Sequence, residues 1–223
     1  MVTAQNYYQQ NKAKYLKQFS NLLLATEQIL SIKFPADELK ILLSEMQSAF
    51  LSLIAKIPYI GGKQNELTQN LVVCAEYLAI YQVLKKHDLS LTQIARIIPQ
   101  IAKLQLEQMP WLNKITMRFF WRMMFTKWFK KQMQKSAAIS QQRKFKDDFV
   151  YTFVAGDGKN FNFGFDFTEC AICKFFQQEN ASEFVPIMCE LDYVISDFVK
   201  VKLNRTTTLA NRGSCCDFRY NKG

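Results

Sequence analysis

Reactive side chains gather near the C-terminal end of this 223-residue chain. Five of its six cysteines lie at or after position 170, and carboxylates and guanidinium groups lie among them. The charged members of the group are Asp166, Glu169, Asp192, Arg205, Asp217 and Arg219. Thiols and carboxylates supply nucleophiles and proton carriers, and guanidinium groups bind anions. The grouping predicts a site for chemistry at this end of the chain.

The segment SCCDFRY, residues 214–220, is the densest part of this group. A strand here would divide its side chains between two faces, with Cys216, Phe218 and Tyr220 on one and Cys215, Asp217 and Arg219 on the other. Asp217 and Arg219 then either pair with each other or take part in catalysis, and both alternatives stay open. We expect the segment to be inserted in the sheet as a strand that supplies part of the site.

Cys170 is predicted to follow a strand and to open a helix, where backbone N–H groups and the helix dipole favour a thiolate. Glu169 beside it opposes that effect, and Cys173 lies one turn further on. A lone C-x-x-C is a weak metal signal, and adding Cys189 and Cys216 matches no zinc spacing. We therefore expect no cofactor and no metal site, with zinc kept as an alternative. Each cysteine could also be a small buried side chain.

His87, the one histidine, lies in KKHDLS at an expected helix end, next to two lysines. We expect it to be a surface or cap residue. Any catalytic base is then a carboxylate or a thiolate rather than an imidazole.

The chain carries a formal net charge of +10, and ten Lys and Arg lie between Lys114 and Lys146 without one Asp or Glu. A solvent-exposed helix face is the interpretation we favour, with an anionic partner, a membrane surface or an acidic protein as alternatives. Within it, residues 111–135 read as one helix rich in aromatics, either buried on one side, which we favour, or lying on lipid. No nucleic-acid partner is expected, because no such motif is present.

The N-terminus is polar and lacks the apolar run of a secretory signal, and no run is long enough to span a membrane. We expect a cytoplasmic protein with reduced thiols, acting on a small molecule.

Apolar periodicity predicts helices over 11–34, 34–60, 65–90 and 90–109, the last interrupted or restarted near Pro99. The period changes near residue 147. Alternating aromatics, Phe161 to Phe167, and the turn GDGK predict a hairpin. Helices over 168–180, with Thr168 as N-cap, and 182–198 follow, and a second strand pair over 199–220 closes the sheet. The fold class is α+β, with a helical region (1–145) and a Cys-rich α+β region (146–223) completing one globular unit.

The ordered motifs GFDFTECAICKFF, EFVPIMCELDY and LNRTTTLANRGSCCDFRY, with IPYIGGKQN upstream, resemble the L-2-amino-thiazoline-4-carboxylic acid hydrolase family from about residue 55 to the end. The resemblance implies an enzyme that opens a thiazoline ring with water to give a carbamoyl-cysteine. The matching positions are Gly61, Gly62, Asn65, Asp166, Cys170, Cys189, Asp192, Arg205, Gly213, Cys216, Asp217 and Arg219, whereas Cys173 and Cys215 are additions of this sequence.

The chemistry of that reaction assigns roles to these positions. The catalytic candidates are Cys170, Cys189, Cys216, Asp192 and Asp217, and the substrate-binding candidates are Arg205, Arg219, Asp166 and Asn65. A thiolate attacks directly, Cys170 first and Cys189 second, or a carboxylate activates water. Arg205 or Arg219 holds the substrate carboxylate. The alternative is a non-catalytic small-molecule or metal-binding module that docks through a basic helix.

Overall fold

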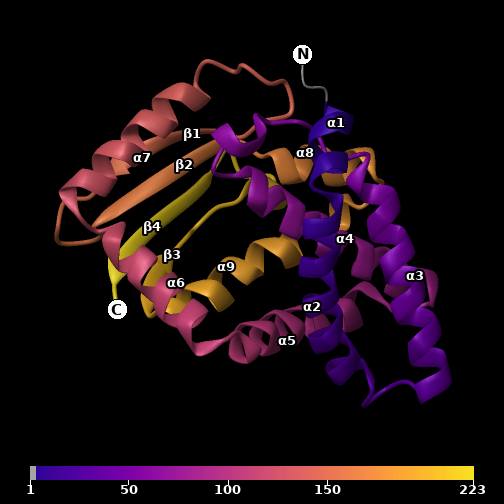
Figure 1. The fold of residues 1–223 in the computed structure, drawn as a ribbon. Helices are drawn as coiled ribbons and strands as arrows, with labels where there is room; N and C mark the ends of the chain where they lie inside the picture. Colours follow the sequence, from indigo (N-terminus) through magenta and orange to yellow (C-terminus); the bar gives the residue numbers. More distant parts are fainter. Residues whose placement is uncertain (1–3) are drawn as a thin grey trace.

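A computed structural model describes residues 4–223, with side chains from Tyr7 onward, and confirms the α+β class. Seven α-helices fill the N-terminal part of this range: α1 (Ala4–Gln10), α2 (Lys12–Leu30), α3 (Ala36–Ile54), α4 (Thr68–Lys86), α5 (Leu91–Gln108), α6 (Trp111–Met123) and α7 (Lys127–Ser140). The sheet and two further helices follow: β1 (Val150–Ala155), β2 (Phe163–Glu169), α8 (Ala171–Gln178), α9 (Val185–Val199), β3 (Val201–Asn204) and β4 (Cys216–Lys222). In Figure 1, α2–α4 lie to one side of the molecule and the sheet to the other, with α9 between them.

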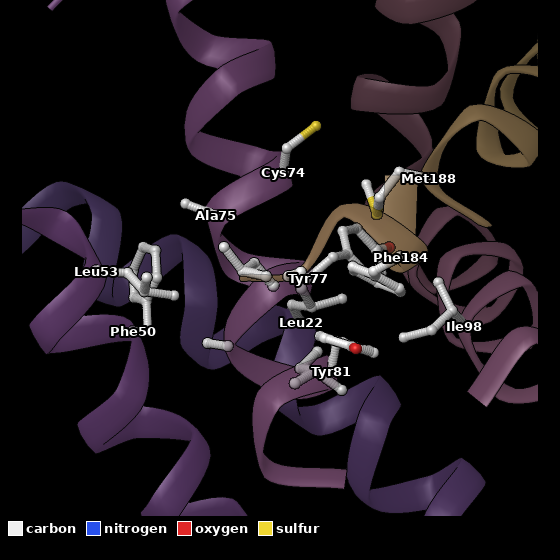
Figure 2. Close-up of a cluster of buried hydrophobic side chains, with 14 of the residues drawn as sticks. Leu22, Phe50, Leu53, Cys74, Ala75, Tyr77, Tyr81, Ile98, Phe184 and Met188 are labelled. Carbon is white, nitrogen blue, oxygen red and sulfur yellow. The ribbon is translucent and has the colours of Figure 1, made fainter. Parts of the chain in front are cut away.

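Helix α4 is buried around most of its circumference, which is the pattern of a central helix. Tyr81 on α4 stacks on Phe184 with ring centroids 4.4 Å apart, and Phe184 stacks on Phe176 of α8 at 5.7 Å. Figure 2 shows Tyr81 and Phe184 beside side chains of α2, α3 and α5. The helical N-terminal part and the C-terminal part therefore share one hydrophobic core.

The four strands form an antiparallel sheet in the order β1-β2-β4-β3. The C-terminal strand β4 is an inner strand, as the sequence predicted, and the β1–β2 hairpin is confirmed. Aromatic side chains from β2 and β4 share one face, where Phe163 stacks on Tyr220 at 5.2 Å. Phe125, just after α6, and Trp121 on α6 cover this face, at 5.1 Å from Phe163 and 5.5 Å from Tyr220. The opposite face carries polar side chains.

Four local predictions are wrong. Helix α5 continues through Pro99, because burial of Ile98 and Ile101 on either side of it outweighs the lost hydrogen bond. The segment 111–135 is two helices rather than one, because Thr126 caps α7 by accepting from the Phe129 N–H.

The other two errors concern strand β2 and its ends. Phe161 lies before β2, and its ring faces the Arg219 guanidinium on the polar side of the sheet. Thr168 is within β2 and donates to the Val150 carbonyl, so Cys170 takes the N-cap position of α8. On α6 the favoured one-sided burial is partial: Met117 and Trp121 pack against the hydrophobic cluster around Phe163 and Tyr220, and no residue of the helix is fully buried.

Candidate active site

Helix α9 and the segment that follows β3 bring a carboxylate, a guanidinium and a thiol together. Cys189 and Asp192 lie one turn apart on α9 and so share a face. Arg205 donates from Nη1 to Asp192 Oδ2 at 2.6 Å and from Nη2 to the Cys189 carbonyl at 2.9 Å. Its guanidinium lies 5.1 Å from the rings of both Tyr193 and Phe218, and its side chain is only 3% exposed. Arg205 therefore positions Asp192.

Asp192 has the ionisation behaviour of a proton carrier. Burial raises its pKa to about 6, although the charge and the hydrogen bond of Arg205 act to lower it. The Asp192 side chain is 37% exposed, so water reaches it. A carboxyl group that titrates near neutral pH and touches solvent is suited to general acid–base catalysis.

Four thiols lie around this ion pair, and burial sets their ionisation. Burial raises the pKa of Cys189 to about 12 and that of Cys216 to about 11, with the Asp192 charge adding to both. The pKa of Cys74 is raised well above its ordinary value by burial and by the nearby Cys170 and Asp192. All six cysteines are free. The surrounding thiols are therefore protonated at neutral pH.

Cys170 does not become the thiolate that its helix start suggested. The backbone N–H groups of Ile172 and Cys173 do lower its pKa, as expected. A hydrogen bond with the Cys173 thiol and burial outweigh them, and the pKa rises well above its ordinary value. The Cys173 hydrogen bond, with burial, thus outweighs the effect of the helix terminus on the pKa of Cys170.

Cys74 and Tyr220 belong to this group and were not among the predicted site residues. Cys74 comes from α4, and Figure 2 shows its sulfur pointing away from the cluster around Tyr77. Its sequence context, an apolar helix, carries no signal for a site. The pKa of Tyr220 is raised by burial and then by the Asp192 charge. The sequence did contain a signal for Tyr220: strand alternation places Cys216, Phe218 and Tyr220 on one face of the sheet.

Asp166 and Arg219 lie on the other face of the sheet. Arg219 Nη1 approaches Asp166 Oδ1 to 2.7 Å, at an angle outside hydrogen-bond geometry, and donates to the Phe218 carbonyl at 2.9 Å. Gly164 makes room for this side chain, since a Cβ there would lie 2.9 Å from Arg219 Cδ. The thickness of the sheet separates this ion pair from the thiols.

Asp217 holds the segment between β3 and β4. Its carboxylate accepts from the Thr206 N–H at 2.9 Å, the Thr207 N–H at 2.7 Å and the Thr206 hydroxyl at 2.7 Å. Burial acts to raise its pKa, and these hydrogen bonds lower it below the ordinary value. The alternative that Asp217 pairs with Arg219 is wrong, because each has other partners. Leu209 in the same segment donates its N–H to Cys216 Sγ at 3.2 Å.

Asn65 closes the turn that leads into α4. Its Nδ2 donates to the Ile60 carbonyl at 2.7 Å and to the Asp148 carboxylate at 2.9 Å, and its Oδ1 accepts from the Leu67 N–H at 2.9 Å. These hydrogen bonds use both polar atoms of the Asn65 side chain to hold the local structure of the turn. Gly61 and Gly62 in the same turn have φ values of 117° and 59°, which favour glycine.

The remaining features lie away from the thiols. His87 is the C-cap residue of α4, as expected, and its Nε2 lies 2.9 Å from Glu45. Two surface hollows, one beside Glu45 and Lys86 and one beside Gln141 and Tyr151, contain none of the predicted site residues. Among residues 4–223, no three His, Cys, Asp or Glu side chains are grouped so as to hold a metal ion. No helix of that range is long and apolar enough to cross a bilayer.

Comparison with known proteins identifies the family. The family model of L-2-amino-thiazoline-4-carboxylic acid hydrolase matches residues 73–220, and the chain belongs to this family. The match contains Cys74 and the whole Asp192–Arg205 group, whereas the turn with Gly61, Gly62 and Asn65 precedes it. Neither the curated proteins nor the solved structures gave a match.

Proposed function

We propose that this protein hydrolyses a small cyclic amidine-like substrate of the 2-aminothiazoline-4-carboxylate kind, with Asp192 as the general base. The observation that carries the proposal is the Asp192–Arg205 pair. It lies within the residues that match the hydrolase family, it keeps contact with water, and Asp192 has a pKa of about 6. A hydrolase needs a base that is ionised at the pH of the reaction and reaches a water molecule.

The chemistry requires both protons of water to reach the product. Asp192 takes a proton from water as the oxygen attacks carbon 2 of the ring, the C=N electron pair becomes a lone pair on nitrogen, and protonated Asp192 passes its proton to that nitrogen. The C–S bond then breaks and the sulfur leaves with the bonding pair, while Asp192 takes the remaining proton of the attacking oxygen and delivers it to that sulfur. Carbon 2 becomes a carbamoyl group on nitrogen, and the product carries a free thiol. Substrate and one water account for every atom.

The other groups have supporting roles in this scheme. Both terminal nitrogens of Arg205 already donate hydrogen bonds, to Asp192 and to the Cys189 carbonyl. Arg205 therefore contributes positive charge near the substrate carboxylate rather than a direct hydrogen bond to it. Cys189 and Cys216 carry protonated thiols, which are weak nucleophiles. This favours water activated by a carboxylate over direct attack by a thiolate. Arg219 and Asp166 lie on the opposite face of the sheet and have no step in it.

Asp192→Asn tests the proposal. We expect it to lower the rate of thiol release from 2-aminothiazoline-4-carboxylate by about 100-fold or more, because the amide cannot accept the proton of water. The wild-type rate should rise with pH through about 6, the pKa of Asp192, because only the ionised carboxylate is a base. Asp197→Asn, an exposed position on the same helix, is the matched control and should keep the wild-type rate.

Three other results would redirect the assignment. Full activity in Asp192→Asn with total loss in Cys189→Ser would make the thiol the nucleophile. Stoichiometric zinc in the purified active protein would indicate a metal-bound hydroxide. Thermal stabilisation by the compound without any thiol release would indicate a binding module rather than an enzyme.

A further inference from the structure

Helix α6 presents apolar side chains on two opposite faces. Met117 and Trp121 face inward and pack against the cluster under the sheet. Trp111, Ile115 and Phe119 follow one another at intervals of four residues and face outward, with exposed fractions of 71%, 52% and 63%. The hydrophobic core accounts for the first face only. The second face is unpartnered in the described residues.

Further exposed aromatic side chains lie on the flank of α6 and at the start of α7. Phe120, which is 51% exposed, meets Phe129 edge to face at 5.3 Å, and Phe129 meets Trp128 at 6.0 Å. Trp128 is itself 63% exposed. The two helices meet at Thr126, and Figure 1 shows them as consecutive helices at the edge of the molecule that carries the sheet. We call the exposed residues of 111–135 the α6–α7 surface.

Positive charge surrounds these apolar side chains. Arg122, Lys127, Lys131 and Lys135 are all exposed, and no acidic residue lies between positions 114 and 146. Within residues 4–223, the only member of this stretch paired to a carboxylate is Arg143, with Glu169. The surface thus combines unneutralised cations with tryptophan and phenylalanine.

This combination defines the chemistry of the partner. Basic and aromatic side chains exposed together on a short helix are typical of helices that lie in the interfacial layer of a bilayer. The rings enter the boundary of the acyl chains, and Lys and Arg meet anionic headgroups. Duplex nucleic acid would match the charge but would leave the outward stripe of Trp111, Ile115 and Phe119 in water.

We propose that the α6–α7 surface docks the protein on a bilayer surface that carries anionic lipids. Helix α6 lies in the plane of the interface, with its outward stripe inserted and its inward face kept on the protein core. This proposal is independent of the chemistry at Asp192, because none of the residues around that carboxylate belongs to the surface.

Vesicle sedimentation with the full chain tests the proposal. We expect the protein to sediment with vesicles that contain phosphatidylserine, to bind vesicles of phosphatidylcholine alone at least about tenfold more weakly, and to be released as salt screens the charges. Trp111→Ser/Phe119→Ser should weaken binding about tenfold or more, since it removes the inserted rings. Lys127→Glu/Lys131→Glu should do the same through charge.

Matched variants separate this effect from loss of folding or of net charge. Leu24→Ser/Ile32→Ser removes two exposed apolar side chains elsewhere, and Lys33→Glu/Lys40→Glu makes the same charge change elsewhere. Both should bind like the wild type, and circular dichroism should show all four variants folded. Absence of sedimentation, equal binding to both vesicle types, or preferential binding to duplex DNA would overturn the proposal. The proposal would also be overturned if the wild type formed a dimer in solution and the Trp111→Ser/Phe119→Ser variant were a monomer, because the surface would then bind a second copy of the chain.

Discussion

At the scale of single residues, burial decides how the titratable groups of this protein behave. The clearest case outside the candidate site is Glu76 on α4, which is 1% exposed and whose Oε1 has no hydrogen-bond partner. Burial raises its pKa to about 8, against a lowering contribution from Gln18. The folded protein therefore holds a proton on Glu76 at neutral pH, whereas the unfolded chain does not.

Glu76→Gln should remove a pH dependence of stability. The folded-state pKa of about 8 exceeds the ordinary 4.5, so the folded state binds the extra proton in this window and stability falls as the pH rises from 4.5 to 8. The cost to the wild type at pH 7 is about 3 kcal/mol. Urea unfolding at pH 5 and pH 8 measures it: the loss of stability between these values should shrink in Glu76→Gln and persist in Glu107→Gln, an exposed control. An unchanged pH dependence in Glu76→Gln would show that this carboxyl group is already ionised in the folded protein.

At the scale of elements, the segment between β3 and β4 positions the candidate site. It begins with Arg205, which holds Asp192, and Asp217 ties its next two residues back to β4. Gly213 lets the segment fold on itself, because a Cβ there would lie 1.9 Å from Thr207 Oγ1. Asp217 thus has a structural role: it holds the segment that positions Arg205.

Two substitutions of Asp217 separate a structural role from a catalytic one. Asp217→Ala leaves the N–H groups of Thr206 and Thr207 without an acceptor and should lower the free energy of unfolding by about 2 kcal/mol. Asp217→Asn keeps an acceptor oxygen and should retain most of the stability and of the thiol-release activity. Loss of activity in a folded, stable Asp217→Asn protein would instead make this carboxylate part of the chemistry.

The elements were predictable where one period governs a segment. The 3.6-residue pattern predicted α2 to α5, and alternation predicted the hairpin and strand β4. The end of α6 was missed because the aromatic pattern runs on through Thr126. Strand alternation also implied that Cys216 and Arg219 face opposite ways, which the structure bears out. The contribution of Cys74 was not predictable, because it depends on the packing of α4 against segments more than 90 residues away.

At the scale of the whole molecule, the core joins segments from both ends of the chain. Phe184 lies between Tyr81 of α4 and Phe176 of α8, and is fully buried. The Asp192 group rests on the same packing, since α4 supplies Cys74 and α9 follows Phe184 directly. The division of the chain near residue 145 remains a prediction. A variant of Phe184 tests whether the two regions unfold together or separately.

Phe184→Ala should destabilise the entire chain. Removing a fully buried ring leaves a cavity between α4 and α8 and should lower the free energy of unfolding by about 3–5 kcal/mol. Phe119→Ala, an exposed phenylalanine of α6, is the matched control and should change it by less than about 0.5 kcal/mol.

Tryptophan emission reports on Trp111, Trp121 and Trp128, whereas circular dichroism reports on all helices. Both transitions should move together in Phe184→Ala, because one shared core unfolds as one unit. Separate transitions, with only the circular dichroism signal shifted, would show that residues 1–145 and 146–223 are independent domains.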